Sequence, residues 1–181
     1  MKKTIAIAII ILLSTKSYSQ ISKGNWLIGG DVKFNYTANK VVDSRYSSTT
    51  LNINPQLGYF ILDKFAVGLR PSLGFVFSSG ASNHVTSYSV GPYARYYFLD
   101  ETRMLNLFLQ GDYAYGGEKT NDQTARNNVN KYSISGGPVV YFNSSVGLEF
   151  VIAYSHYKMV AQPVSVSTVE IGLGLQVSLS K

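Results

Sequence analysis

The 181-residue chain contains no cysteine, and this absence removes several kinds of site at once. Disulfide frameworks and thiolate metal centres both need cysteine, so neither holds this chain together. A lipid anchor on a mature N-terminal cysteine is excluded for the same reason. The stability of the fold must therefore come from packing, hydrogen bonds and charge pairs.

Histidine is almost as scarce, with only His84 and His156 in the chain. A hydrolase or acyltransferase site would need a nucleophile with histidine and carboxylate partners. His84 lies near Ser82 and His156 follows Ser155, but no clustered ligands support a metal site. We expect both histidines to be solvated or interfacial, and we predict no enzymatic activity, no metal and no cofactor.

Charged residues make up only 14% of the chain, and the net charge of +6 is mild. Loss of Lys2, Lys3 and Lys16 with an N-terminal leader would lower it by three, to about +3. So weak a positive charge argues against a nucleic-acid partner. The mean hydropathy near zero does not indicate a soluble protein, because a membrane barrel alternates apolar and polar residues and averages to the same value.

The chain shows no apolar run of the roughly 20 residues that a transmembrane helix needs. The apolar run at residues 5–13 follows Lys2 and Lys3 and leads to small side chains of the kind that a signal peptidase inspects. This order is typical of a secretory signal peptide. We therefore predict a signal peptide at residues 1–19, which directs export through the Sec pathway, and a single domain at residues 20–181.

After residue 20 no convincing 3.6-residue apolar period appears, whereas a period of two recurs along the whole chain. In the segment that starts at Trp26, one parity continues through Ile28 to Tyr36 and is apolar, while the other parity contains Asp31 and Lys33. Eight segments with this pattern are predicted strands, at residues 26–36, 51–59, 65–77, 88–98, 105–115, 132–142, 146–155 and 169–179.

The connections between these strands alternate in length. Three are short turns, at residues 61–64, 99–103 and 143–145. Four are longer and polar, at residues 37–50, 78–87, 116–131 and 157–168. Short turns at one end and long loops at the other are typical of an up-and-down outer-membrane barrel. The sequence thus predicts an all-β, eight-stranded antiparallel up-and-down transmembrane β-barrel.

Four prolines fall inside the predicted strands, namely Pro55, Pro71, Pro92 and Pro138. Each removes a hydrogen-bond donor from the ladder, and a closed barrel has no free edge at which that loss is harmless. We therefore expect a bulge or irregular pairing at each of them.

A soluble, lipocalin-like barrel would show the same alternation with its two faces exchanged, so side-chain volume has to decide between the two. Eight strands enclose a space just wide enough for side chains to fill. The apolar parity is crowded with Trp, Phe, Tyr and Leu, whereas the polar parity holds many glycines, among them Gly58, Gly68 and Gly174. The bulky face must then point outward, and an apolar exterior requires lipid.

Aromatic residues on this outward parity gather at the two ends of the predicted strands. Those near the short turns are Trp26, Tyr59, Phe65, Phe98 and Phe142. Those near the long loops are Tyr36, Phe77, Tyr88, Tyr115, Tyr132 and Tyr154. Two aromatic girdles are typical of the two interfaces of a bilayer. Strands of about ten residues, tilted by about 40°, would rise about 25 Å, which matches the apolar band of such barrels.

Three sequence features carry a resemblance to a known family. They are the stretch Lys-Gly-Asn-Trp-Leu-Ile-Gly-Gly at residues 23–30, the run Pro-x-x-Gly-Tyr-Phe at residues 55–60, and Val-Gly-Leu at residues 67–69. The chain resembles the small outer-membrane β-barrels common in Bacteroidetes, which are often labelled porin-family and are similar in build to OmpA/OmpX-type barrels. The resemblance covers essentially all of the mature chain and implies a place in the outer membrane.

Seven charged residues fall on the inward parity: Asp31, Lys33, Arg70, Arg95, Asp112, Glu149 and Glu170. A lone buried charge costs several kcal/mol, so we expect these residues to pair in the lumen. Such pairs would either plug the barrel as a structural network or form a gated narrow pore, as charged rings tune selectivity in channels. The sequence leaves both alternatives open.

Long loops on a rigid barrel commonly carry binding. A surface adhesin that acts through its loops is therefore a second functional hypothesis, from a different class than a structural or porin-like barrel. The partners expected for either are outer-membrane lipid and the barrel-assembly machinery during insertion, with a surface ligand at the loops as a further possibility. We expect a monomer.

Overall fold

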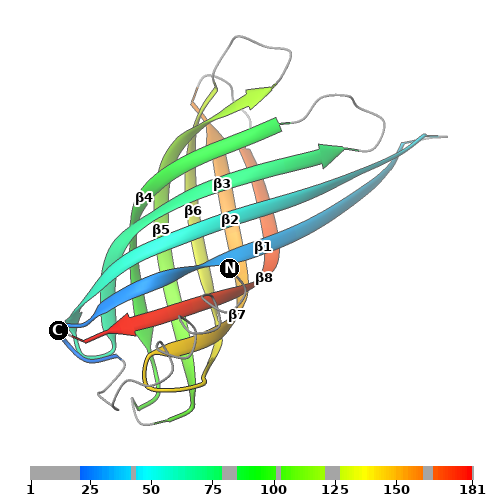
Figure 1. Cartoon of the computed structure of the whole chain (residues 1–181). Coiled ribbons are helices and arrows are strands. Elements are labelled where there is room, and N and C mark those ends of the chain that lie inside the picture. Colours follow the sequence, from blue (N-terminus) through cyan, green and yellow to red (C-terminus); the bar gives the residue numbers. More distant parts are fainter. Residues whose placement is uncertain are drawn as a thin grey trace, which may run out of the picture.

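Eight antiparallel strands close into one barrel in the computed structural model, each paired with its neighbours in chain order and the last with the first (Figure 1). The strands are β1 (Trp26–Val41), β2 (Ser44–Leu62), β3 (Phe65–Ser78), β4 (Val85–Tyr97), β5 (Leu105–Thr120), β6 (Asn127–Tyr141), β7 (Val146–Met159) and β8 (Ser165–Leu179). The predicted eight-stranded, all-β fold is confirmed.

The structure describes residues 21–41, 44–78, 85–100, 103–120, 127–160 and 165–180. The predicted signal peptide and His84 lie outside these residues. In the described part of the chain, no helix is long and apolar enough to cross a membrane.

The period of two in the sequence becomes the two faces of the barrel wall. In β1 the side chains of Leu27, Asp31 and Lys33 are buried inside the barrel, whereas Trp26 and Phe34 are 46% and 47% exposed. The same division holds in the other strands. The polar parity with its glycines therefore faces inward and the bulky apolar parity faces outward, as the volume of an eight-stranded barrel requires.

The strands extend further toward the long loops than the sequence predicts. The predicted loop at residues 37–50 is wrong over most of its length, because β1 continues to Val41 and β2 begins at Ser44. β5, β6, β7 and β8 are lengthened in the same way. Beyond an apolar band both faces of a strand can meet water, so the alternation that marks a strand in sequence disappears while the backbone ladder continues.

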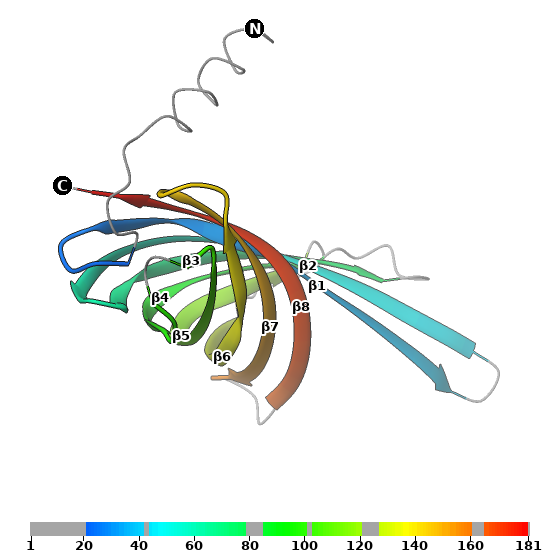
Figure 2. The same ribbon diagram turned by 90° about the horizontal axis from the view of Figure 1, so that it is seen from below.

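The β1–β2 hairpin projects beyond the rest of the barrel at the long-loop end (Figures 1 and 2). The pairing of β1 with β8 ends where Phe34 lies opposite Ile171. Beyond that point β1 pairs only with β2, and β8 pairs only with β7. The seam between β1 and β8 is therefore open toward the long loops, although Asn35 Nδ2 donates a hydrogen bond across it to the Val169 carbonyl at 2.8 Å.

The strand prolines interrupt the pairing without shifting it. Pro55 on β2 lies opposite Pro71 on β3, and the ladder between these strands skips this position and resumes in the same register. Similar gaps lie at Pro92, in the ladder between β4 and β5, and at Pro138, in the ladder between β6 and β7. Of the two expected outcomes, a bulge or irregular pairing, the structure shows irregular pairing in the form of gaps in the ladder. A gap is tolerated because a one-residue shift would turn every inward side chain of the strand outward.

Two inward glycines make room for a tyrosine inside the barrel. Gly58 on β2 lies opposite Gly68 on β3, and the ring of Tyr93 from β4 covers both. A Cβ atom added at Gly58 would fall 2.2 Å from the Tyr93 hydroxyl, and one at Gly68 would fall 2.8 Å from the Tyr93 ring. The space that these inward glycines leave is thus filled by a large side chain from a neighbouring strand.

Candidate functional site

The candidate functional site is the interior of the barrel, which is built in layers from the short turns toward the long loops. The first layer is apolar and consists of Ile21, Leu27, Phe60, Ala66, Tyr97, Phe108, Val139 and Tyr141, and Val151, which follows Glu149 on β7, belongs to the same apolar cluster. Ile21 precedes β1, and its carbonyl accepts a hydrogen bond from the Lys64 amide at 2.7 Å. The Gly24 amide donates to the Phe60 carbonyl at 2.9 Å, so the segment before β1 is held against the β2–β3 turn.

Arg95, on β4, is the centre of the second layer. Its Nη1 donates to Glu149 Oε1 on β7 at 2.5 Å, and its Nε donates to Gln110 Oε1 at 2.8 Å. The guanidinium carbon lies 4.2 Å from the centre of the Phe108 ring, so the cation also contacts the apolar layer below it. The charge of a fully buried arginine is thereby matched by a carboxylate and by neutral acceptors.

Arg70, on β3, forms the third layer with two aspartates. Its Nη2 donates to Asp31 Oδ2, and its Nη1 lies 3.5 Å from Asp112 Oδ1. Asn54 Nδ2 donates to Asp31 Oδ1 at 2.7 Å, and Ser133 Oγ donates to Asp112 Oδ2 at 2.6 Å. One guanidinium is therefore shared by two buried carboxylates, whose other oxygens accept hydrogen bonds from neutral donors.

Glu170 and Lys33 lie nearer the long loops and outside these ion pairs. Asn52 Nδ2 donates to Glu170 Oε1 at 2.5 Å, and Ser155 Oγ donates to Glu170 Oε2 at 3.2 Å. Lys33 is 1% exposed and forms no ion pair with any described residue, although it has favourable electrostatic interactions with Asp31 and Glu170 at longer range. The structure thus brings five of the seven predicted lumen charges into ion pairs and satisfies Glu170 with neutral groups.

Lys131 is a lumen residue that the sequence analysis placed in a loop. β6 carries it inward, where it is 6% exposed and its Nζ lies 4.9 Å from the centre of the Tyr157 ring. Its parity could have revealed this position, since it is shared with the inward Ser133 and Ser135. The asparagines that precede Lys131, at positions 127, 128 and 130, hide the alternation, and the segment therefore resembles a polar loop.

Neutral side chains complete the network, and the sequence analysis gave them no role. Tyr97 Oη donates to Gln176 Oε1 at 2.6 Å, and Gln176 Nε2 donates to Tyr141 Oη at 2.8 Å. The inward parity of these residues is visible in the sequence. The register that brings β4, β6 and β8 together at this height is not, because it depends on strand pairing across the barrel.

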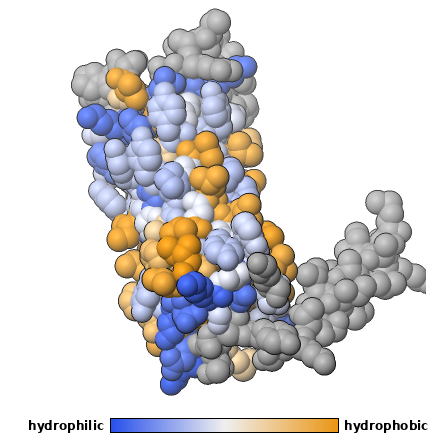
Figure 3. Space-filling view, turned by 90° about the vertical axis from the view of Figure 1, so that its left-hand side faces the viewer, coloured by the Kyte–Doolittle hydropathy of each residue, from blue (hydrophilic) through white to orange (hydrophobic). Residues whose placement is uncertain are grey.

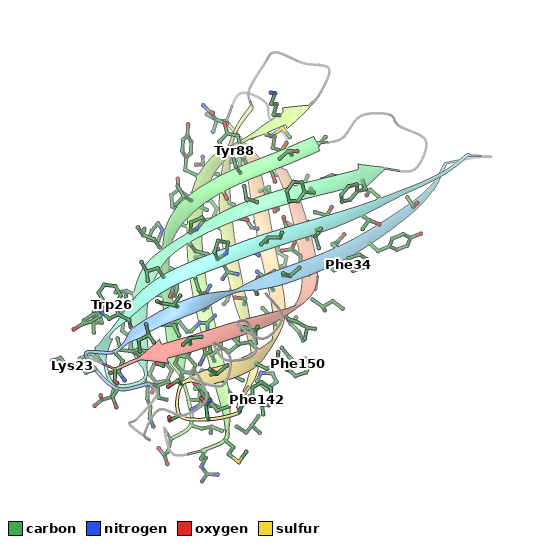
Figure 4. All side chains as sticks on the ribbon, viewed as in Figure 1. Lys23, Trp26, Phe34, Tyr88, Phe142 and Phe150 are labelled. Atoms are coloured by element: carbon green, nitrogen blue, oxygen red, sulfur yellow. The ribbon has the colours of Figure 1, made fainter. Side chains whose placement is uncertain are left out.

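Most of the aromatic residues assigned to the two predicted girdles are exposed on the outer face of the barrel. In Figure 4, Trp26 and Phe142 lie toward the short turns and Tyr88 toward the long loops. Ten of the eleven are at least 36% exposed, namely Trp26, Tyr36, Tyr59, Phe77, Tyr88, Phe98, Tyr115, Tyr132, Phe142 and Tyr154. Phe65 is only partly exposed. In the view of Figure 3, strongly hydrophilic residues lie mainly toward the two ends of the barrel and apolar residues over the wall between them.

His156, the histidine that the described residues include, is hydrogen-bonded to a serine and not to a carboxylate. His156 Nδ1 lies 3.0 Å from Ser167 Oγ, which also accepts a hydrogen bond from Tyr154 Oη at 2.9 Å. No carboxylate of a described residue is hydrogen-bonded to this imidazole. Within the described ranges, no group of three or more His, Asp and Glu side chains is placed to hold a metal ion.

Three solved structures with the same architecture are distant in sequence from this chain. Neisserial surface protein A superposes with a TM-score of 0.63 at 13% identity, over 86% of this chain and 97% of its own. The N-terminal β-barrel domain of OprF from Pseudomonas aeruginosa gives a TM-score of 0.58 at 16% identity, over 87% and 98% of the two chains. The outer-membrane protein OprG from Pseudomonas aeruginosa gives 0.51 at 14% identity, over 91% and 100%.

The sequence itself has no match among protein-family models or curated proteins. Identities this low show the fold alone. The chain therefore has the eight-stranded antiparallel barrel fold that these outer-membrane proteins share.

Proposed function

We propose that the chain is an integral protein of a bacterial outer membrane and that its barrel spans the bilayer. The observation that carries this proposal is the exposure of the apolar parity. Ile152 is 64% exposed and Leu173 is 54% exposed, whereas Arg95 and Glu149 are buried inside. A wall of this kind would drive association in water, and hydrocarbon removes that cost. The fold of the three solved barrels supports the same location.

The rest of the proposal follows from this location. The leader at residues 1–19 directs export through the Sec pathway, the barrel-assembly machinery inserts the mature chain, and the protein is a monomer in outer-membrane lipid. The resemblance at residues 23–30 and 55–60 supports membership of the OmpA/OmpX-like, porin-family barrels of Bacteroidetes.

Heat-modifiable mobility tests the membrane assignment. We expect the refolded protein to need detergent or lipid for solubility and to migrate differently in electrophoresis with and without boiling. A protein that stays soluble without detergent and shows no mobility shift would contradict the assignment.

We propose further that the barrel has a structural, non-enzymatic role and a closed lumen. Two features support this. The apolar layer around Phe60 and Phe108 occupies the short-turn end, and the ion pairs of Arg95 and Arg70 occupy the middle. Opening such a lumen to ions would leave buried charges without partners, which costs several kcal/mol for each.

Planar-bilayer recordings separate a closed barrel from a narrow pore. We expect no regular openings from the refolded wild-type protein. Steady, ion-selective openings that change when Arg70 or Arg95 is replaced by Gln would overturn the closed-lumen proposal and favour the pore.

Surface adhesion through the loop end is the second candidate function. It is favoured by the β1–β2 hairpin, whose strands continue past the point where β1 leaves β8 (Figure 2). Shortening this hairpin should reduce attachment of cells that carry the protein. Attachment that is unchanged after the hairpin and the other long loops are shortened would remove this candidate.

A further inference from the structure

A cavity of about 600 Å³ lies at the long-loop end of the barrel interior, above the ion pairs. Its floor includes Asn52 and Glu170, and its walls come from strands on all sides of the barrel mouth. This volume is in the range of small-molecule sites in proteins. The cavity lies above the ion pairs of Arg70 and Arg95, so its presence does not depend on whether the barrel conducts.

The inward face changes character at this level. Deeper in the barrel the inward residues around the ion pairs are polar or charged, but around the cavity four of them are apolar: Val76, Val129, Met159 and Val166. Apolar side chains that face an open, water-accessible cavity are unfavourable unless something covers them. A ligand with an apolar part would do so.

One carboxylate in this cavity has no partner. Glu118, on β5, lines the cavity and forms no hydrogen bond or ion pair with any described residue. The other charged groups at this end are either engaged or outside the cavity lining: Glu170 accepts hydrogen bonds from Asn52 and Ser155, and the Lys131 ammonium lies over the Tyr157 ring. Lys33 is buried without an ion pair to a described residue, but it does not line the cavity. The free charge on the cavity wall is therefore negative.

The cavity borders the seam between β1 and β8, which the hydrogen bond from Asn35 to the Val169 carbonyl bridges. Its lining includes Asn35 on β1 and Ser167 and Val169 on β8, the two strands that separate beyond Phe34. Phe34 lies eight residues along β1 from Trp26, which places the start of the opening about 20 Å above the short-turn girdle. A ligand that concentrates at the outer interface of the bilayer would lie next to this seam.

We propose that this cavity binds an amphipathic organic cation, whose protonated amine lies at Glu118 and whose apolar part lies against Val76, Val129 and Met159. A hydrogen bond from an ammonium group to a carboxylate is stronger than a neutral one, so Glu118 supplies selectivity for the cation. The valines and Met159 supply the apolar contact, and the flexible thioether adapts to ligands of different shape.

Dansylcadaverine, a fluorescent primary amine with an apolar ring system, is a suitable probe. The full mature protein is refolded into nanodiscs of zwitterionic phosphatidylcholine, and binding is followed by fluorescence anisotropy, with empty nanodiscs to measure partition into lipid. We expect saturable binding of one probe per barrel. The matched neutral probe, in which a hydroxyl replaces the amine, should bind at least about ten-fold more weakly.

Three variants locate the site. Glu118→Gln keeps the shape of the side chain and removes its charge, so it should weaken binding of the amine about ten-fold and leave the neutral probe unaffected. Val129→Thr is nearly isosteric and should weaken both probes. Asp100→Asn removes one negative charge at the opposite, short-turn end, and it should change neither. Electrophoresis with and without boiling shows that each variant is folded.

The existence of the site and the class of its ligand can each be overturned separately. Absence of saturable binding to the folded wild-type protein would remove the site. Equal affinity for the amine and the neutral probe, or unchanged affinity in Glu118→Gln, would remove the cation as the ligand class.

Discussion

Arg95 and Glu149 face each other across the barrel interior, from β4 and β7, and pair through both arms of the guanidinium. Nη1 donates to Oε1 at 2.5 Å and Nη2 donates to Oε2 at 3.2 Å, with both side chains at most 1% exposed. These strands are not neighbours in the sheet. The pair therefore ties opposite walls of the barrel together, which backbone pairing between adjacent strands cannot do.

Removing one partner of this pair should be far more damaging than removing both. Glu149→Leu leaves the Arg95 charge buried without its carboxylate, and we expect a loss of about 3–5 kcal/mol in the free energy of unfolding. The double variant Arg95→Met with Glu149→Leu should recover most of that loss, because no charge is then left buried. Urea unfolding in lipid vesicles measures all three proteins. A double variant as unstable as Glu149→Leu alone would show that the pair itself, and not the uncompensated charge, carries the stability.

The fit of Tyr93 over Gly58 and Gly68 should make these glycines intolerant of even one methyl group. An added Cβ at Gly68 would lie 2.1 Å from the Leu57 carbonyl oxygen, which the sheet holds in place. We expect Gly68→Ala to lower the free energy of unfolding by about 1–3 kcal/mol. Gly111→Ala is the matched control, because a Cβ at Gly111 meets nothing within 4 Å.

The same tyrosine offers a test of coupling. At Gly58 the nearest atom to an added Cβ is the Tyr93 hydroxyl, at 2.2 Å, and the next is the ring carbon that bears it, at 3.1 Å. Gly58→Ala should therefore cost less in a Tyr93→Phe background than in the wild type. Additive effects of the two substitutions would mean that the ring moves aside and that the contact does not limit the packing.

The Lys64–Asp100 pair joins two of the short turns and predicts a pH effect outside the membrane-spanning strands. Lys64 Nζ donates to Asp100 Oδ1 at 2.9 Å. This hydrogen bond, and after it the charge of the same ammonium, lower the pKa of the Asp100 carboxyl. A carboxyl whose pKa is lowered by folding stabilises the fold above its unfolded pKa, and this contribution is lost as the pH falls through the folded value.

Carbon-detected NMR titration of Asp100 measures this pKa directly. Lys64→Met should raise it toward that of an ordinary aspartate, and high salt should do the same in the wild type because the pair is exposed to solvent. Lys23→Met removes a charge near the same end and should leave it unchanged. If the Asp100 pKa were the same in wild type and Lys64→Met, the pair would not form in solution.

The period of two was enough to predict which residues of β1 face inward. Asp31 and Lys33 alternate with Val32 and Phe34 because one face of the strand lines the polar interior and the other face is apolar. It was not enough to predict where β1 ends. Past Tyr36 the sequence of the hairpin no longer alternates between apolar and polar residues, and strand continuation there depends on backbone pairing. Lys131 was missed for this reason, although it lies on the same parity as Ser133.

Partners across the lumen could not be predicted from the sequence. That Arg70 and Asp112 lie inside follows from parity, but their approach to 3.5 Å depends on the stagger of strands that are not adjacent. The same holds for the cavity beside Glu118. Its lining comes from all eight strands, so it depends on the register of the whole barrel, which the local sequence of no single strand shows.

The chain contains a single tryptophan, and its position gives a direct test of the lipid-facing wall. Trp26 is 46% exposed, lies at the short-turn end and packs edge-to-face against Tyr59 with the ring centres 5.2 Å apart. Tryptophan at such a height is typical of the bilayer interface. In vesicles we expect lipids brominated near the glycerol to quench Trp26 emission more strongly than lipids brominated near the end of the acyl chain.

Moving the tryptophan along the wall should reverse that order. Phe150 is 48% exposed on β7. It pairs with Leu173 on β8, and Leu173 pairs in turn with Val32 on β1. Val32 lies six residues further along β1 than Trp26, so Phe150 lies further from the short turns than Trp26 does. In the variant with Trp26→Phe and Phe150→Trp, the indole would lie near the middle of the apolar band, because position 150 is midway along β7 between Val146 at the short turn and Tyr154 in the girdle near the long loops. Quenching should then be strongest with bromine deep in the acyl chain. Equal quenching of both proteins at every depth would mean that the wall does not face lipid. The two positions differ in depth only if the wall lies in the bilayer.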